Sequence, residues 1–322
     1  MHNLAPLIGE AWLTGVHCRV ATGPFAGQTL GEAWKEMTIG WRGKEFQNEA
    51  DFPLLLKFIF PRDKLSIQVH PDDAYAARHE AAAGGRGKTE MWHVVSAEPG
   101  ARLRAGLKTA VTKENFLEAI GDHKLEELFE PYEVHTGDTF FLPAGTPHTI
   151  GPGMVIFEVQ EYSDLTYRIY DYDRRDANGK PRQLHIEKAL EVMNFESETH
   201  AKVTPRELRV RNRKIMEELV ECPYFSAWKF EFDVPGHMSK YDPSDQFSLW
   251  VFLEGEGKIG WSSAQHGMFG SVYCGDFTYK AGECWLIPAD FGSQGYYPKK
   301  KTSLIVAAPH NPKDKFEKDR NA

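Results

Sequence analysis

Cysteine is scarce in this 322-residue sequence, and no two of its four cysteines form a CxxC pair. They stand at Cys18, Cys222, Cys274 and Cys284. This spacing argues against both a zinc knuckle and a dithiol redox motif. Scattered thiols of this kind are typical of the reducing cytoplasm, which is the location that we predict.

The sequence also lacks a basic excess and any long apolar run. It has 38 Lys and Arg against 46 Asp and Glu, whereas nucleic-acid binding depends largely on positive charge. No stretch approaches the ~20 apolar residues of a membrane span. Residues Met1–Glu10 lack the basic and apolar regions of a signal peptide. We therefore expect neither a nucleic-acid partner nor a membrane partner.

Short β-rich runs separated by turn residues account for most of the sequence pattern. The clearest runs are 54–60, 65–70, 91–96, 139–143 and 154–160. Apolar residues recur at convincing helical spacing in only two stretches, 112–129 and 186–195. The pattern predicts a mainly β protein with a few helices.

The length is enough for two domains of about 150 residues each. Segment 174–183 has no apolar period and is predicted to be a loop, so the helix expected at 186–195 could link two compact units. We place one domain at 1–199, with an inserted helical segment near 112–129, and a second at 200–322.

A nine-residue segment occurs twice in the chain. The sequence GDTFFLPAG at 137–145 recurs, conservatively altered, as GECWLIPAD at 282–290. In each copy a turn leads into an apolar strand, which ends at a proline because proline cannot donate to the ladder. The repetition favours two double-sheet jelly-roll barrels, although such a unit also occurs in other β sandwiches.

Polar side chains that could bind a metal stand near the ends of several predicted strands. Gln68 and His70 are two positions apart and therefore share one face of a strand. Glu90 begins another strand after Lys88, and His148 follows the strand at 139–143. Two imidazoles, a carboxylate and an amide oxygen suit Zn²⁺, Fe²⁺ or Mn²⁺.

Each of these residues also has a purely structural interpretation. His70 could lie on an exposed strand end, Glu90 could pair with Lys88, and His148 could be a turn residue. Asp164 and Arg168 lie in an aromatic-rich segment just past a strand. There the guanidinium could hold a phosphate or stabilise an oxyanion, or the two residues could form an ordinary ion pair.

Several motifs together carry a family resemblance. In chain order they are GEAW, GPFAGQTL, PLLLKFIF, QVHPDD, GKTEMWHV, LPAGTPHTIG, SDLTYRIYDYDR and LHIEKAL. From about Gly9 to Phe195 the sequence resembles the short bacterial form of the type I mannose-6-phosphate isomerases, zinc enzymes of the cupin superfamily. The resemblance implies two cupin-like jelly-roll barrels, and matched motifs in the correct order are more specific than any single one.

The resemblance also implies the roles of individual residues. One zinc ion per chain would be bound by Gln68, His70, Glu90 and His148. Arg168 would be the active-site arginine, whereas Lys88 and Asp164 match positions at the substrate. The implied reaction interconverts mannose 6-phosphate and fructose 6-phosphate through an enediol, so the expected partner is a small sugar phosphate.

Two other functions remain open at this point. An iron-dependent cupin dioxygenase would use a similar barrel, but such enzymes commonly have an HxH pair where this chain has Gln68. A non-catalytic sugar-phosphate-binding paralogue would be expected to have lost metal ligands or Arg168, and all of them are present.

The sequence departs from the family pattern in two places. Family members usually have a WGG-like motif before GE[SA]W, whereas only eight residues precede Gly9 here, so we expect a sheet-edge strand to be missing or replaced. In the second repeat Ser293 occupies the position of His148. We therefore expect the second barrel to be metal-free and only the first domain to be catalytic.

Overall fold

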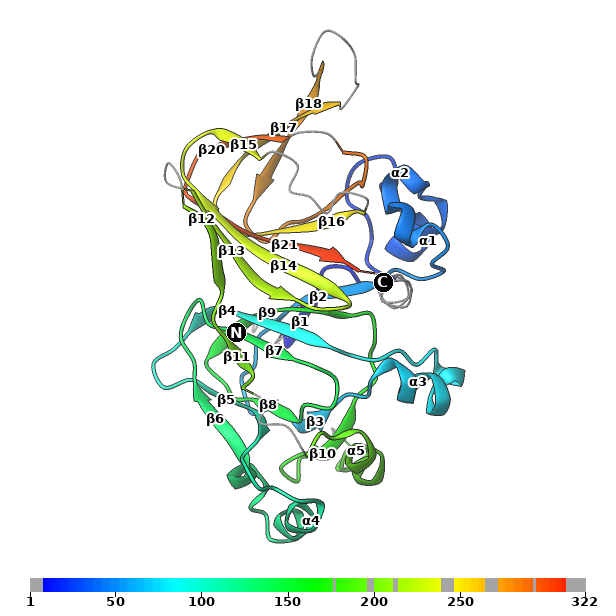
Figure 1. Cartoon of the computed structure of the whole chain (residues 1–322), viewed down its shortest axis with the longest axis vertical. Coiled ribbons are helices and arrows are strands. Elements are labelled where there is room, and N and C mark those ends of the chain that lie inside the picture. Colours follow the sequence, from blue (N-terminus) through cyan, green and yellow to red (C-terminus); the bar gives the residue numbers. More distant parts are fainter. Residues whose placement is uncertain are drawn as a thin grey trace, which may run out of the picture. The chain divides into compact units, whose positions relative to one another are not determined.

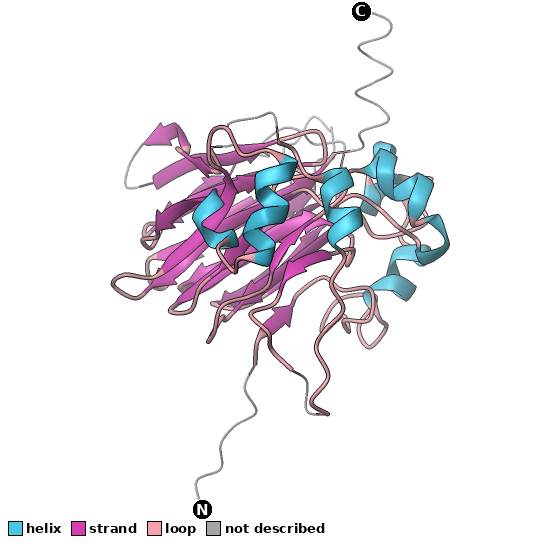
Figure 2. Cartoon of the chain, turned by 90° about the horizontal axis from the view of Figure 1, so that it is seen from below, coloured by secondary structure: helices cyan, strands magenta, loops and turns pink. Residues whose placement is uncertain are grey.

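The computed structural model describes residues 8–175, 178–195, 200–210, 214–238, 246–263, 272–291 and 294–310. Strands dominate this part of the chain and helices are few (Figure 2), which confirms the predicted mainly β fold. The chain divides into two compact units (Figure 1). The first unit comprises 1–15 and 54–203, and the second comprises 16–53 and 204–322.

Two antiparallel sheets make up the first unit. The larger sheet has the strand order β1 (Glu10–Trp12), β2 (Leu54–Ile59), β9 (Met154–Glu161), β4 (Glu90–Ala97), β7 (Thr139–Leu142) and β11 (Lys202–Val203). The smaller sheet has the order β10 (Tyr167–Tyr170), β3 (Ile67–Val69), β8 (His148–Ile150), β5 (Arg102–Leu107) and β6 (Phe129–Glu133).

Apolar side chains from both sheets meet in one core. Trp92 and Val94 of β4 and Ile156 of β9 pack there with Leu103 of β5 and Ile150 of β8. Side chains alternate between the two faces of a strand, so every second residue beside these positions also points between the sheets. This alternation determines which polar residues enter the barrel.

Helices cover the outer face of the smaller sheet. The helical segments of this unit are α3 (Asp73–His79), η2 (Ala81–Ala83), α4 (Lys113–Gly121), η3 (Leu125–Leu128) and α5 (Ile186–Val192). The stretch 112–129 is therefore two helical segments rather than one, because His123 takes a positive φ of 57° just after α4. Phe116 of α4 and Ala189 of α5 pack in one cluster with Ile67 and Val69 of β3.

The second unit repeats the two-sheet plan. One sheet has the order β12 (Arg206–Val210), β13 (Lys214–Glu221), β14 (Phe225–Phe232), β21 (Thr302–Pro309), β16 (Ser248–Glu254) and β19 (Cys284–Ile287). The other has the order β15 (Gly236–Met238), β20 (Gln294–Pro298), β17 (Glu256–Ser263) and β18 (Val272–Lys280). Trp228, Phe252, Ile259 and Tyr296 join both sheets in one core.

The repeated nine-residue segment forms corresponding strands of the two units. Each copy contributes a strand, β7 in the first unit and β19 in the second. A glycine with positive φ precedes each strand, Gly137 at 95° and Gly282 at 86°, a conformation that side chains other than glycine rarely adopt. Ser293, on which the prediction of a metal-free second barrel was based, lies outside the described residues.

Residues 16–53, which the sequence analysis assigned to the first domain, belong to the second unit. They contain α1 (Leu30–Glu36), α2 (Ile39–Arg42) and η1 (Lys44–Phe46). The ring of Trp34 lies 5.4 Å from that of Phe247, which is far away in the sequence. The boundary placed near residue 200 stays a prediction. None of the helices among the described residues is both long enough and apolar enough to cross a bilayer.

Candidate metal centre

Strand alternation directs Gln68 and His148 into the barrel. Ile67 and Val69 point outward into the cluster beneath α4 and α5, so Gln68 between them points inward. His148 lies on the same face of β8 as the core residue Ile150. Gln68 and His148 are direct cross-strand partners, which places their side chains together.

Glu90 and His70 reach the same place from two other strand ends. Glu90 is the first residue of β4 and shares the inward face of the core residue Trp92. His70 follows β3, and its carbonyl accepts a hydrogen bond of 2.8 Å from the N–H of Gly145. Segments distant in the sequence therefore converge on one point.

The backbone of the loop before β4 lies close to the backbone at the start of α3. The N–H of Gly87 donates to Oδ1 of Asp73 at 2.8 Å, and a Cβ on Gly87 would lie 2.5 Å from the nitrogen of Asp73. The N–H of Lys88 donates to the carbonyl of Pro71 at 3.0 Å. Glycine at position 87 thus allows Lys88 to enter the site next to the strand end that carries His70.

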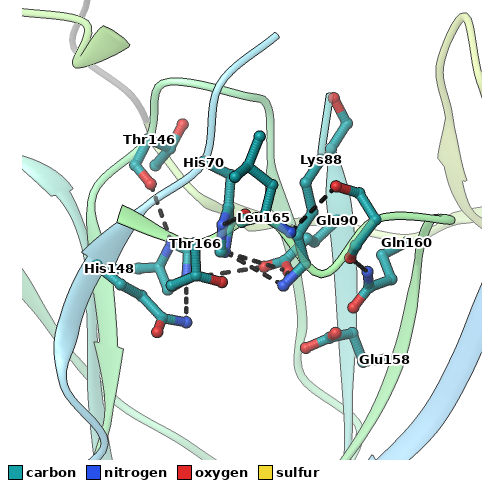
Figure 3. Close-up of polar contacts among 12 residues, drawn as sticks. His70, Lys88, Glu90, Thr146, His148, Glu158, Gln160, Leu165 and Thr166 are labelled. Atoms are coloured by element: carbon teal, nitrogen blue, oxygen red, sulfur yellow. Dashed lines mark hydrogen bonds and ion pairs between the residues drawn. The ribbon is translucent and has the colours of Figure 1, made fainter. Parts of the chain in front are cut away.

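His70, Glu90 and His148 form a compact and fully buried group (Figure 3). Nε2 of His70 lies 3.4 Å from Oε1 of Glu90, and Nε2 of His148 lies 3.8 Å from Oε2. The three possible ligand atoms lie within 4.8 Å of one another. Such a group could bind a metal ion.

Backbone carbonyls determine which nitrogen of each imidazole carries the proton. Nδ1 of His70 lies 2.8 Å from the carbonyl of Leu165, and Nδ1 of His148 lies 2.9 Å from that of Thr146. A carbonyl only accepts, so Nδ1 donates and Nε2 presents its lone pair to the group. Burial lowers the pKa of both imidazoles, and the charge of Lys88 lowers that of His70 further.

Glu90 is held in its ionised form. Burial opposes ionisation, but Lys88 and the other neighbouring groups outweigh it and hold the pKa of Glu90 well below its usual range. Nζ of Lys88 lies 2.8 Å from Oε1 of Glu90. Oε1 of Glu90 therefore faces this ammonium, whereas Oε2 has no hydrogen-bond donor within the described part of the chain. Two neutral imidazoles and an anionic carboxylate fit a divalent cation.

Gln68 lies at the edge of this group. Its Nε2 is 3.2 Å from Nε2 of His148, and its Oε1 accepts a hydrogen bond of 3.3 Å from Ser66. Rotation of the amide by 180° would exchange its oxygen and nitrogen, and metal binding requires the oxygen. The placement of Gln68 is compatible with the predicted ligand role, which stays a prediction.

Arg168 and Asp164 occupy different environments. Arg168 is the cross-strand partner of Gln68 and shares its inward face, and its Nη1 donates to the carbonyl of Gln183 at 3.1 Å. Its guanidinium is half-buried, whereas Asp164 is exposed. The structure therefore places Arg168 directly across from Gln68, and among the described residues it shows no contact of the Arg168 guanidinium or of the Asp164 carboxylate with His70, Glu90 or His148, so the roles of Arg168 and Asp164 stay predictions.

A buried ion pair next to this group was missed by the sequence analysis. Lys57 and Glu158 are cross-strand partners, and Nζ of Lys57 lies 3.1 Å from Oε1 of Glu158. Burial, together with the charge of Glu90, raises the pKa of Glu158. The signal was present in the sequence, because Lys57 and Glu158 are each flanked on both sides by apolar residues of their strand.

Replacing Lys57 with methionine is expected to lower the free energy of unfolding by about 3–5 kcal/mol, because Glu158 is then left buried without its cation. The double variant Lys57→Met/Glu158→Gln should recover much of this loss, since the amide keeps an acceptor for the Trp92 indole N–H, which lies 2.9 Å from Glu158. Urea unfolding of the three proteins measures both values. Equal stability of the single and double variants would contradict this account.

Glu161 gives the protein a pH-dependent stability. Burial, and then the charge of Asp73, raises the pKa of Glu161 from 4.5 to about 8, while its Oε1 accepts the N–H of Thr89 at 2.7 Å. Because the folded state favours the protonated carboxyl group, Glu161 contributes its full stabilisation below pH 4.5. This contribution to the free energy of unfolding is lost as the pH rises through about 8.

Replacing Glu161 with glutamine is expected to remove this dependence, because the amide oxygen still accepts the Thr89 N–H but carries no charge. The difference in unfolding free energy between variant and parent should grow in favour of the variant from pH 5 to pH 9, by roughly 2–4 kcal/mol. Urea unfolding at a series of pH values measures it. A difference that is constant with pH would show that Glu161 does not titrate in this way.

The paired sheets and the buried His–Glu–His group together define a cupin-type barrel protein with a candidate metal centre, and the predicted cupin-like architecture is confirmed. The solved mannose 6-phosphate isomerase of Bacillus subtilis has the same fold, with a TM-score of 0.78 and 30% identity over 93% of this chain and 89% of that chain. A putative mannosephosphate isomerase from Archaeoglobus fulgidus is similar in fold, with a TM-score of 0.71, 94% of this chain and 88% of that chain covered, and 19% identity.

Sequence similarity extends over most of the chain as well. Mannose-6-phosphate isomerase ManA of Bacillus subtilis is 35% identical over 300 residues, which cover 89% of this chain and 87% of the relative. The mannose-6-phosphate isomerase of Streptococcus mutans is 37% identical over 257 residues, 78% of this chain and 77% of the relative. No family model matches the sequence. The chain belongs to the mannose-6-phosphate isomerase family, as the motifs predicted.

Proposed function

We propose that the protein interconverts mannose 6-phosphate and fructose 6-phosphate at the inward-facing group of its first barrel, with one zinc ion held by His70, Glu90, His148 and Gln68. The observation that carries this proposal is the convergence of two neutral imidazoles and an ionised carboxylate on one buried point. Two relatives that are 35% and 37% identical to this chain over the aligned residues are named mannose-6-phosphate isomerases.

The reaction moves a proton between C1 and C2 of the sugar. A proton next to a carbonyl is weakly acidic, so negative charge that develops on the oxygens of C1 and C2 must be stabilised. A divalent cation bound at this group would supply Lewis acidity for that purpose.

The chain's own cations would support the same charge. Lys88 is buried and lies 2.8 Å from Glu90 and 3.4 Å from Nε2 of His70, which favours a place at the reacting carbons over one at the phosphate. Arg168 enters from β10 as a permanently charged guanidinium, suited to the enediolate or to the phosphate. Asp164 is exposed and is a candidate to carry the proton.

A coupled assay of mannose 6-phosphate conversion tests the proposal. We expect turnover by the purified protein, loss of turnover after chelation, and recovery on addition of zinc. Oxygen uptake, measured in the same samples after loading with Fe²⁺, would indicate a dioxygenase instead. Binding of mannose 6-phosphate without turnover, in protein shown to carry metal, would indicate a non-catalytic sugar-phosphate-binding protein.

A further inference from the structure

We propose that Gln160 determines substrate specificity, by accepting a hydrogen bond through Oε1 from a non-reacting hydroxyl of the sugar phosphate. This inference rests on the proposed function and assigns a role to a residue outside the predicted metal and catalytic set. Gln160 is fully buried near the end of β9.

The register of the larger sheet places Gln160 at the site. Gln160 is the direct cross-strand partner of Glu90, which belongs to the His–Glu–His group. It shares the inward face of β9 with the core residue Ile156 and with Glu158. Directly opposed residues have Cβ atoms about 4.5–5.5 Å apart. Figure 3 shows Gln160 and Glu158 side by side at the flank of Glu90.

Hydrogen bonds determine which way the amide of Gln160 points. Its Nε2 donates to the carbonyl of Glu161 at 3.0 Å and to that of Ser163 at 2.7 Å. Both partners only accept, so the nitrogen must lie on that side and the oxygen on the other. A flipped amide would place oxygen against two carbonyl oxygens. The position of Oε1 is therefore set by the surrounding backbone.

Oε1 of Gln160 is left as a buried acceptor without a donor. Among the described residues no N–H or O–H group donates to it. A buried acceptor that stays unpaired destabilises the complex in which it is left. A donor supplied by the substrate would remove that destabilisation, whereas an analogue with hydrogen in place of the hydroxyl would not.

The chemistry of the substrate narrows the choice of hydroxyl. The oxygens on C1 and C2 take part in the reaction, and the oxygen on C6 carries the phosphate. In the ring form, in which C5 carries the ring oxygen, the hydroxyls on C3 and C4 do not react, and each has an O–H that can donate. Since Gln160 lies next to Glu90 on the larger sheet, we infer that its Oε1 accepts a hydrogen bond from one of these two hydroxyls.

The test compares mannose 6-phosphate with its 3-deoxy and 4-deoxy analogues, using the metal-loaded protein and the variant Gln160→Met. The parent protein is expected to prefer mannose 6-phosphate over one analogue by at least about tenfold in kcat/KM. In Gln160→Met this preference should fall toward one for that analogue and stay unchanged for the other. A loss of general structural integrity would instead lower kcat/KM for all three substrates by the same factor.

Glu161→Gln is a matched control, because it alters the neighbouring side chain but leaves the Gln160 amide in place, and it should keep the substrate preferences of the parent. The inference is overturned if Gln160→Met discriminates as the parent does. It is also overturned, whatever the stability of the variant, if the parent protein uses all three substrates equally. Failure of the parent protein to convert mannose 6-phosphate at all would instead refute the proposed function.

Discussion

Replacing His148 with alanine is expected to remove the bound metal and to lower the turnover by at least about a thousandfold. His148 contributes one of the two neutral imidazoles, and its Nε2 is held toward the group by the Nδ1 hydrogen bond to Thr146. Without it, one imidazole and one carboxylate remain from the buried group. Elemental analysis after gentle purification and the coupled assay measure the two losses.

A matched control separates this effect from a general loss of structure. His135 lies in the same unit, and its side chain is 71% exposed, so His135→Ala should keep both metal and activity. His148→Gln preserves most of the side-chain volume next to Trp92 and should still lose metal affinity if the imidazole is the ligand. A His148→Ala protein that is fully active and metal-loaded would refute the proposed ligand role.

Replacing Arg168 with alanine is expected to reduce kcat/KM by about 10²–10⁴ while the metal content stays unchanged. Arg168 is the cross-strand partner of Gln68 and does not belong to the His–Glu–His group, so under the proposed function its charge would act on the substrate and not on the metal. Loss of a preorganised positive group near developing negative charge lowers transition-state stabilisation without removing a metal ligand.

Two further variants make the test of Arg168 specific. Arg168→Lys keeps the charge but loses the planar donor geometry, so it should recover only part of the activity. Arg102→Ala removes an arginine from β5 whose side chain is 69% exposed, and it should leave turnover near the parent value. Near-normal turnover of Arg168→Ala, or metal loss in that variant, would contradict the assignment.

The alternation of strand residues explains why several candidates could be found from the sequence. Gln68 stands between two apolar residues, and a period of two places its side chain opposite to theirs, whichever fold surrounds it. Glu90 begins a strand that the apolar pattern also predicted, whereas His148, which was predicted to follow the strand at 139–143, begins the short strand β8. The resemblance to a known family then named these residues together, and the relatives confirm the family.

Other features depend on which strands become neighbours. Lys57 and Glu158 are about a hundred positions apart in the chain, and only the register of β2 against β9 makes them an ion pair. The packing of residues 16–53 with the second unit was missed for the same reason. It depends on contacts between residues far apart in the sequence, such as the ring contact of Trp34 with Phe247. The spacing of apolar residues within one segment does not show which distant segment that segment will contact.

The strand content, the opposite directions of neighbouring side chains in a strand, and the family could all be predicted from the amino-acid sequence. These properties depend on the spacing of a few consecutive residues and on motifs read in order. Tertiary structure alone decided the protonated nitrogen of each imidazole, the orphaned oxygen of Gln160 and the pairing of buried charges. The proton position of His70 and the pairing of Lys57 with Glu158 depend on segments about a hundred positions away, which only the closed barrel brings together. His148 and Gln160 are oriented by carbonyls a few residues away, whose direction depends on the conformation of the folded backbone and not on a local period.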